Sequence, residues 1–414
     1  MSGVSPARVV AVLGATLLVA AFNVRLALAQ AIWSPRDEIA HYDYVDKLTQ
    51  LHLPRPDEPI SEYTVSLCRI FPWLSPPPFD GTQSSMGPAG FSYEARQPPL
   101  YYAFLAGPNF VMRAFHATPR FQIAALRYLT IVLFEAGALL LVLVFRELSL
   151  LAGVSRSWGW VLAVAVSLPS APVFTTLGND AAGLLCGSLA AFLGARFWRT
   201  RDPVFAVGLS AVAGLSVLVK HTNGLLVVLP LLAWAAPSLW PSGGTPRHGA
   251  SRRLTLLLPG LIVAPYLLLN RFLFGSVMKS GIVTDSFRSL VQPIREDVLF
   301  VRVLARGSVE LSHFGLLVPR WVAWVLLALL AVNLAARSWR ALTRPSRWDL
   351  VVLLCCGLSV AMIVSAMLLN RLAPGVQWYQ FRHYAAYLPF WFIGVFALPL
   401  PRMGRAAAHT LARA

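Results

Sequence analysis

The stretch FQIAALRYLTIVLFEAGALLLVLVF, residues 121–145, is almost entirely apolar and carries only two charged side chains, Arg127 and Glu135. A helix needs ~20 apolar residues to cross the hydrocarbon core of a bilayer. Backbone N–H and C=O groups cannot stay unpaired in lipid, so a run of this kind predicts a membrane-spanning helix.

Similar runs recur along the whole chain of 414 residues, of which 57% are hydrophobic and 13% charged. The mean hydropathy of +0.63 excludes an ordinary soluble domain. We therefore expect an all-α membrane protein with about ten transmembrane helices. The predicted spans are 9–30, 121–145, 157–176, 180–197, 203–220, 222–240, 254–273, 316–335, 349–370 and 384–401.

The first of these runs has features of a secretory signal, because Arg8 precedes it and Ala27, Ala29 and Ala31 resemble a small-residue cleavage site. However, Arg25 interrupts the apolar region. We therefore interpret the segment as an uncleaved membrane anchor.

The net charge of +17 comes from basic residues that are dispersed through loops, which argues against nucleic-acid binding. By the positive-inside rule, short Arg-rich loops are cytoplasmic, and so are both termini. This topology makes residues 1–414 one membrane domain with two outer loops, 33–120 and 275–315. The loop and terminal arginines that define the inner side are Arg8, Arg146, Arg156, Arg196, Arg199, Arg201, Arg247, Arg252, Arg253, Arg337, Arg340, Arg344, Arg347, Arg402 and Arg405.

The first outer loop is predicted to carry amphipathic helices. Ser34, Pro35 and Asp37 have the form of an N-cap, a first-turn proline and a capping-box acid, so a helix on the outer leaflet is expected to follow. A second helix is expected after Pro98 and Pro99.

Five polar clusters lie far apart in sequence, but this topology brings all of them to the outer surface. That convergence is the main functional signal in the sequence. The clusters are Asp37, Glu38 and His41; Glu94, Arg96 and Gln97; Asn179 and Asp180; Lys220 and His221; and Arg382 and His383.

Some of these clusters have purely structural interpretations. Asp37 and His41 share one helical face and can form a general base or a metal site, but capping by the acid and packing by the imidazole explain the spacing equally well. Glu94 beside Arg96 is typical of a solvated ion pair. Asn179, at the start of a span, is typical of an N-cap.

The remaining polar groups also leave alternatives open. Lys220 and Arg382 can extend their charges to the membrane surface and contact lipid head groups, or they can bind a substrate phosphate. Glu135 lies inside a predicted span, where an acid is either functional or hydrogen-bonded to another helix.

The ordered motifs SPRDEIAHYDY, EARQPPLYY, GNDA and RHYAAYLPF resemble the GT-C superfamily of membrane glycosyltransferases, in particular a bacterial polytopic family of unassigned function. The resemblance implies a GT-C-like fold and transfer of a sugar, with inversion, from a polyprenyl-phosphate donor to a glycan, lipid or protein acceptor. It places the reaction on the outer face of a bacterial cytoplasmic membrane.

The resemblance also implies roles for single residues. The acidic pair carries over to Asp37 and Glu38 as catalytic residues, with Asp37 as the general base. Lys220 and Arg382 would stabilise the departing phosphate. The substrate-binding candidates are His41, Glu94, Arg96, Asn179, Asp180, Lys220, His221, Arg382 and His383.

The sequence leaves cofactor and activity open. Gln97 stands where some relatives have a histidine, so a divalent cation bound by Asp37 and Glu94 is an open alternative and no metal site is assigned. A transporter or flippase of a lipid-linked glycan is a second interpretation, although such sites usually lie near the midplane between repeats. A non-catalytic envelope-assembly subunit is a third.

Overall fold

The computed structural model describes residues 6–29, 32–33, 38–55, 58–71, 93–152, 159–164, 176–235, 249–275, 320–343, 346–372 and 385–396. Within these ranges the chain is helical apart from short connections and forms no β-sheet, which confirms the all-α prediction. Each predicted span overlaps a described helix, although residues 159–164 are the only helical part described for the span 157–176.

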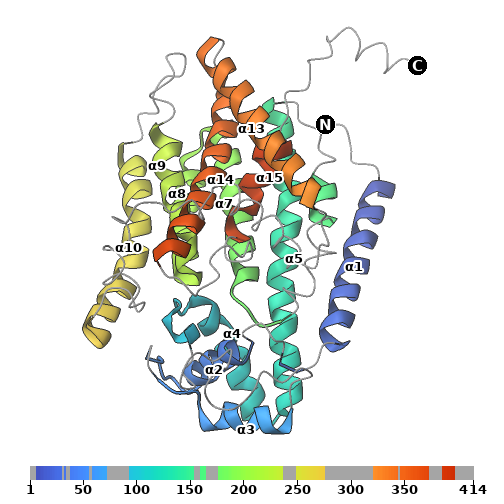
Figure 1. The fold of residues 1–414 in the computed structure, drawn as a ribbon, viewed down its shortest axis with the longest axis vertical. Helices are drawn as coiled ribbons and strands as arrows, with labels where there is room; N and C mark the ends of the chain where they lie inside the picture. The colour runs from blue at the N-terminus through green and yellow to red at the C-terminus, as the bar shows by residue number, and fades with distance from the viewer. Residues whose placement is uncertain are drawn as a thin grey trace.

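The long helices, together with several short ones, form a bundle, and the other short helices gather at one end of it (Figure 1). The bundle contains α1 (Pro6–Ala29), α5 (Pro119–Ala152), α7 (Asp180–Thr200), α8 (Pro203–Val219), η3 (His221–Val227), α9 (Val228–Ala235), α10 (Gly249–Phe274), α13 (Arg320–Thr343), α14 (Arg347–Leu372) and α15 (Leu388–Phe396). The end region contains α2 (Glu38–Thr49), α3 (Glu62–Ile70), η2 (Tyr93–Arg96) and α4 (Leu100–Ala114).

Three described helices are long and apolar enough to cross a membrane, namely Pro119–Leu151, Asp180–Thr200 and Arg252–Phe274. Shorter apolar helices, including Pro203–Val219, lie in the same bundle. The last of the three long helices exposes much of its apolar surface, and Leu268 alone is 68% exposed. Such a surface favours contact with lipid rather than with water.

Two polar networks mark the ends of the bundle. Arg127 of α5 pairs with Glu38, whereas Glu147 of the same helix pairs with Arg196 and Arg199 of α7. At 1.5 Å per residue, Arg127 and Glu147 are about 30 Å apart along the axis of α5. That spacing equals the thickness of a typical hydrocarbon core, ~30 Å.

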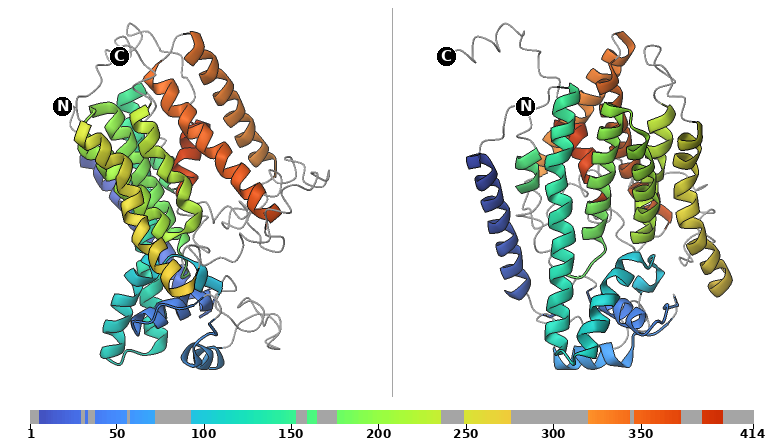
Figure 2. Two further views of the ribbon diagram at one scale, coloured as in Figure 1. Left: turned by 90° about the vertical axis from the view of Figure 1, so that its left-hand side faces the viewer. Right: turned by 180° about the vertical axis from the view of Figure 1, so that it is seen from behind.

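The end region packs its helices around α2, as Figure 2 shows from two sides. Nearly every residue of α2 is buried, and the polar ones have partners: Asp43 accepts the backbone N–H of Ser61, while Lys47 contacts Asp43 and Glu58. The prediction that this helix is amphipathic, with one face open to water, is therefore wrong, while its placement at the outer leaflet stays a prediction. Its polar side chains are satisfied inside the protein instead of facing water.

The predicted second helix is confirmed as α4, and apolar side chains lie on both its buried and its exposed face. Tyr101 and Leu105 are buried against α2 and α5, whereas Phe104, Phe110 and Phe115, which follows the helix, are exposed. The buried face of α4 carries the aromatic side chains that reach the polar clusters.

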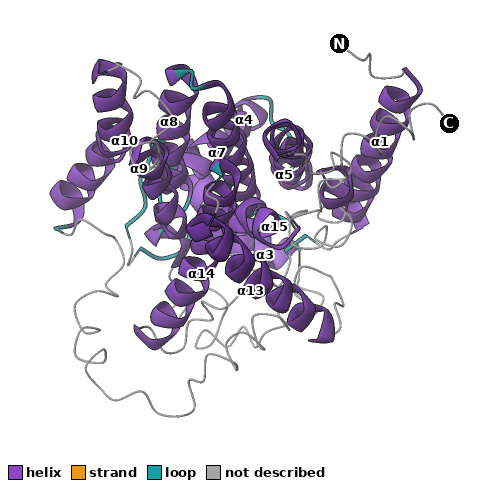
Figure 3. Ribbon diagram, turned by 90° about the horizontal axis from the view of Figure 1, so that it is seen from above, coloured by secondary structure: helices purple, strands orange, loops and turns teal. Residues whose placement is uncertain are grey.

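Helix α1 lies at the edge of the bundle beside α5 (Figure 3). The amide of Asn23 donates a hydrogen bond to Glu135, and the guanidinium of Arg127 donates one to the carbonyl of Ala27 at 3.0 Å. The first contact confirms the structural alternative for Glu135, a hydrogen bond to another helix.

The last described segment packs closely against α7. A Cβ atom added at Gly187 would overlap the carbonyl group of Ala386, so the glycine permits this approach. In addition, the hydroxyl of Tyr387 donates to the carbonyl of Thr222 at 2.7 Å and accepts the N–H of Leu225 at 3.1 Å. These contacts hold the segment beside η3, immediately after Lys220.

Candidate functional site

Three side chains of the end region form a buried hydrogen-bonded chain. The hydroxyl of Tyr102 donates to Oε2 of Glu94 at 2.7 Å and lies 2.9 Å from Nδ1 of His41. The same Nδ1 is 3.5 Å from Oε2 of Glu94. Glu94 therefore contacts Tyr102 and His41, and no ion pair links it to Arg96 among the described residues, which contradicts the solvated ion-pair interpretation.

Asn179 joins this chain from the start of α7. Its side chain makes no capping bond, although the residue occupies the N-cap position. Instead, Nδ2 donates to the hydroxyl of Tyr102 at 3.5 Å and to the carbonyl of Val219 at 3.4 Å. The predicted capping role is therefore wrong, because tertiary partners use the amide.

Aromatic rings enclose the chain. The ring of Tyr44 stacks on Tyr102 with centroids 4.0 Å apart, and its hydroxyl donates to the carbonyl of Gln97 at 3.1 Å. Burial, followed by the charge of Glu94, raises the pKa of Tyr102 well above its ordinary value. Tyr102 therefore keeps its hydroxyl hydrogen at physiological pH.

A buried ion pair lies where α7 begins and α8 ends. The ammonium of Lys220 donates a hydrogen bond to Oδ1 of Asp180, and Lys220 is only 4% exposed. The charge of Lys220 is therefore paired inside the protein rather than extended into the surroundings. The pair places a cation and a carboxylate one residue from Asn179, at the same end as His41.

His221 and Arg96 meet through a backbone contact. Nε2 of His221 lies 3.2 Å from the carbonyl oxygen of Arg96, and the His221 ring is 6.1 Å from the ring of Tyr266 in α10. This contact joins η3 to η2. The second and fourth clusters are therefore adjacent.

Glu38 has a different environment from the other candidates. Its two carboxylate oxygens accept hydrogen bonds from Arg127 at 2.7 and 2.6 Å, and the backbone N–H of Leu177 donates to Oε1 at 3.1 Å. Both oxygens are thus engaged by α5 and by the connection that leads to α7. This arrangement points to a positioning role rather than to proton transfer.

Several predicted site residues lie outside the described ranges. Asp37, Arg382 and His383 belong to this group, so their catalytic and binding roles stay predictions. The structure brings together the remaining candidates, which are His41, Glu94, Arg96, Asn179, Asp180, Lys220 and His221.

The described residues contain no group of three His, Cys, Asp or Glu side chains arranged to hold a metal ion. His41 and Glu94 form a pair of this type, with 3.5 Å between Nδ1 and Oε2. Since Asp37 lies outside the described ranges, the alternative of a cation bound by Asp37 and Glu94 stays a prediction.

Sequence reasoning missed Tyr102 and Arg127 as parts of the site. Tyr102 belongs to the motif EARQPPLYY, where the second tyrosine is on the buried face of α4. Arg127 was one of only two charged residues in the apolar run 121–145. An isolated charge near a span end was the available signal, because such a group needs a buried partner.

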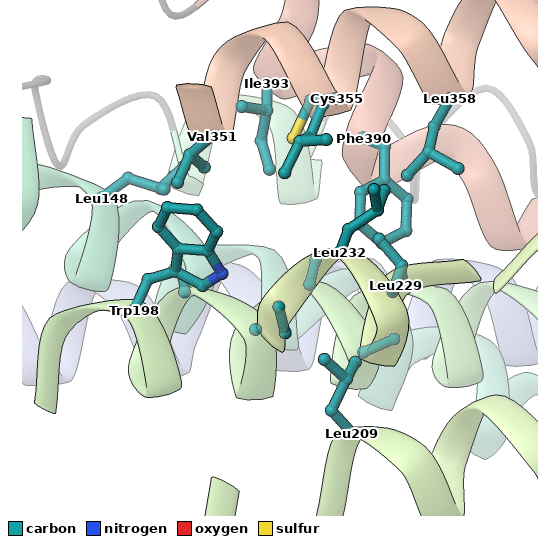
Figure 4. A pocket seen from close by; sticks show the side chains of 16 residues that line it. Leu148, Trp198, Leu209, Leu229, Leu232, Val351, Cys355, Leu358, Phe390 and Ile393 are labelled. Atoms are coloured by element: carbon teal, nitrogen blue, oxygen red, sulfur yellow. The ribbon is translucent and has the colours of Figure 1, made fainter. Parts of the chain in front are cut away.

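A cavity of about 50 Å³ lies within the bundle (Figure 4), and no residue of the polar chain lines it. Leu148, Trp198 and Leu209 contribute to its wall from α5, α7 and α8, and Phe390 does so from α15. Its lining side chains are apolar apart from the thiol of Cys355 and the indole N–H of Trp198, and none of them is charged. It offers no group for acid–base chemistry or phosphate binding.

Comparisons with protein-family models, curated proteins and solved structures find no match to this chain. The functional argument therefore rests on the chain's own residues and on the motif resemblance.

Proposed function

We propose that this protein is a membrane glycosyltransferase that moves a sugar from a polyprenyl-phosphate donor to an acceptor at the outer face of a bacterial cytoplasmic membrane. The proposal includes ten spans in a GT-C-like arrangement and cytoplasmic termini. Glycan, lipid and protein acceptors are all compatible with it. The loops 54–90 and 275–315 are the proposed regions of acceptor recognition.

One observation carries the proposal: polar residues from distant segments meet at one end of the bundle. His41 and Glu94 of the end region contact Tyr102, which also receives the amide of Asn179. The next residue along the chain, Asp180, holds Lys220. An acid and an imidazole can move a proton, and a cation can stabilise a departing phosphate, which are the tasks of sugar transfer from a lipid phosphate.

The position of these groups suits a lipid-linked donor. Helix α7 begins at Asp180 and α8 ends at Val219, so the Lys220 ammonium lies where two apolar helices end. A lipid with its tail in the bilayer would carry its phosphate at this depth. An ammonium has three N–H donors, and a phosphate could share them with Asp180.

The proposed chemistry divides among few residues. Asp37 removes the proton of the acceptor hydroxyl while the lipid phosphate leaves, and Lys220 and Arg382 stabilise the negative charge on that phosphate. Glu38, predicted together with Asp37 as an acidic pair, is assigned here to positioning through Arg127. A divalent cation is compatible with the scheme but no step depends on it.

A strain lacking the gene tests the proposal. We expect its membranes to accumulate an unused lipid-linked sugar that is accessible from outside, and its envelope glycans to lose that sugar. Unchanged lipid-linked sugars and glycans would refute the transferase. Accumulation of a complete lipid-linked glycan on the inner leaflet would instead identify a transporter.

Complementation by variants then tests the base. Asp37→Asn keeps the size of the side chain but cannot accept a proton as a carboxylate does, so transfer should fall by roughly 10²- to 10⁴-fold. Glu62→Gln is the matched control, because Glu62 is an exposed acid in the first turn of α3. Parental transfer by Asp37→Asn would refute the role of Asp37.

A further inference from the structure

The hydrogen bonds around Tyr102 define where the proton of His41 resides. The Tyr102 hydroxyl has a single hydrogen, which it donates to Glu94 at 2.7 Å. A carboxylate can only accept a hydrogen bond, and the amide nitrogen of Asn179 can only donate one. Tyr102 must therefore accept from Nδ1 of His41, 2.9 Å away.

Two further facts agree with this assignment of the hydrogens. Burial and the charge of Glu94 raise the pKa of Tyr102, so the hydroxyl hydrogen is retained. The carboxylate of Glu94 is also 3.5 Å from Nδ1 of His41, and its negative charge favours a hydrogen on that nitrogen. Whether the imidazole is neutral or charged, Nδ1 keeps its hydrogen.

The other ring nitrogen, Nε2, is then the one that can accept. Among the described residues it makes no hydrogen bond, and it faces the backbone of Gly178, where an added Cβ would lie 3.8 Å away. Gly178 is immediately before Asn179 and Asp180. Nε2 is thus directed toward the segment that joins the two buried polar groups.

We propose that Glu94 and Tyr102 hold His41 with its hydrogen on Nδ1, so that Nε2 accepts a hydrogen bond from a substrate hydroxyl beside Gly178. Sugars and sugar acceptors carry such hydroxyl groups, and this inference rests on the proposed transferase function. Tyr102 and Glu94 are positioning residues in it, whereas His41 contacts the substrate.

The tautomer can be measured without any substrate. Protein labelled with ¹⁵N-histidine has eight histidines, and the signals lost in His41→Asn identify His41. We expect Nε2 of the parental protein to give the signal of an unprotonated nitrogen at a pH where the ring is neutral. The double variant Tyr102→Phe/Glu94→Gln should shift the hydrogen toward Nε2. A hydrogen on Nε2 in the parental protein, or an unchanged tautomer in the double variant, would overturn the proposal.

Two substitutions of His41 separate its two nitrogens in the transfer assay. Asn places an amide near the position of Nδ1, so His41→Asn keeps a donor for Tyr102 but loses Nε2, whereas His41→Gln places an amide near the position of Nε2. We expect transfer by His41→Asn to fall about tenfold or more, equivalent to losing about 1.4 kcal/mol of binding to the reacting substrate. His41→Gln should retain more activity.

His52 provides the control, since it is an exposed histidine that pairs with Glu58. His52→Asn should transfer at the parental rate. Parental transfer by His41→Asn would overturn the role of Nε2. If the parental protein transfers no sugar at all, the proposed function fails, while the ¹⁵N measurement still decides whether Tyr102 and Glu94 fix the tautomer.

Discussion

Replacing Arg127 by Met should destabilise the protein strongly, because Arg127 connects three parts of the fold. Its guanidinium donates to both oxygens of Glu38 at 2.7 and 2.6 Å and to the carbonyl of Ala27 at 3.0 Å. Met keeps a long apolar side chain but removes every one of these donors. The carboxylate of Glu38 would then be buried without its cation.

The expected magnitude follows from the burial of both partners. The Glu38 side chain is fully buried and that of Arg127 is 3% exposed. Removing one member of a buried ion pair costs about 3–5 kcal/mol. Glu38→Gln should also cost about 3–5 kcal/mol, because the amide is neutral and leaves the guanidinium of Arg127 buried without its counter-ion. The double variant Glu38→Leu/Arg127→Met should lose less than the sum of the losses in Glu38→Leu and Arg127→Met.

Unfolding of the purified protein by a denaturing detergent, in micelles of fixed composition, measures these differences. Arg120→Met is the matched control, because Arg120 is an exposed arginine in the first turn of the same helix. It should change the free energy of unfolding by about 0.5 kcal/mol or less. If Arg127→Met is no more destabilising than Arg120→Met, the pair does not hold the end region and the reasoning fails.

The same variants test the role assigned to Glu38. If this residue only positions α2, the loss of transfer in Glu38→Gln should follow the loss of stability, and a lower temperature should restore part of the activity. A Glu38→Gln protein with parental stability and no transfer would instead make Glu38 a catalytic residue.

Two other predictions concern stability at low pH and topology. Burial raises the pKa of Asp46 from 3.8 to about 6, so the folded state binds this proton more tightly than the unfolded state does. The stability that this proton contributes should therefore be present at about pH 4, decline by up to about 3 kcal/mol as the pH rises to about 6, and stay absent above that pH. Asp46→Asn should flatten the plot of unfolding free energy against pH. Equal plots for the two proteins would contradict the assignment. For topology, Ser66→Cys in α3, introduced in a background without native cysteines, should react with an impermeant reagent in intact cells. Thr200→Cys, at the end of α7 that is far from Asp180, should not react. The opposite labelling would invert the proposed orientation.

The positions of the helices could be predicted from sequence because their signal is local. An apolar run such as 121–145 has one stable solution in lipid, a helix, and α5 contains it. The meeting of Glu94 and Asn179 at one end could also be predicted, since alternation of inner and outer loops places both at the same surface. Neither inference requires knowledge of which side chains touch.

The contacts of the site could not be predicted, because they join residues far apart in the chain. Asn179 has the sequence context of an N-cap, and that local rule gives way to the tertiary partners Tyr102 and Val219. Arg127 and Glu38 are 89 residues apart, so nothing in either neighbourhood indicates the pair. For α2, the capping signals predicted an amphipathic helix on the outer leaflet, but burial of nearly the whole helix gives its polar side chains partners inside the protein.

The two polar networks of the bundle differ in a way that bears on function. On the proposed inner side, the side chains of Arg196 and Arg199 are 34% and 30% exposed, whereas Arg337 and Asp349 form a buried pair. At the other end, the side chains of His41 and Lys220 are only 7% and 5% exposed.

Burying an imidazole or an ammonium costs free energy unless each finds a hydrogen-bonding or charged partner. Charged residues that only mark a membrane boundary do not have to be buried. Donors that are held in place by Glu94 and Asp180 do favour substrate binding, because their polar groups are already oriented before a substrate arrives. The oriented donors around Glu94 and Asp180 therefore favour a substrate site at the end that carries His41.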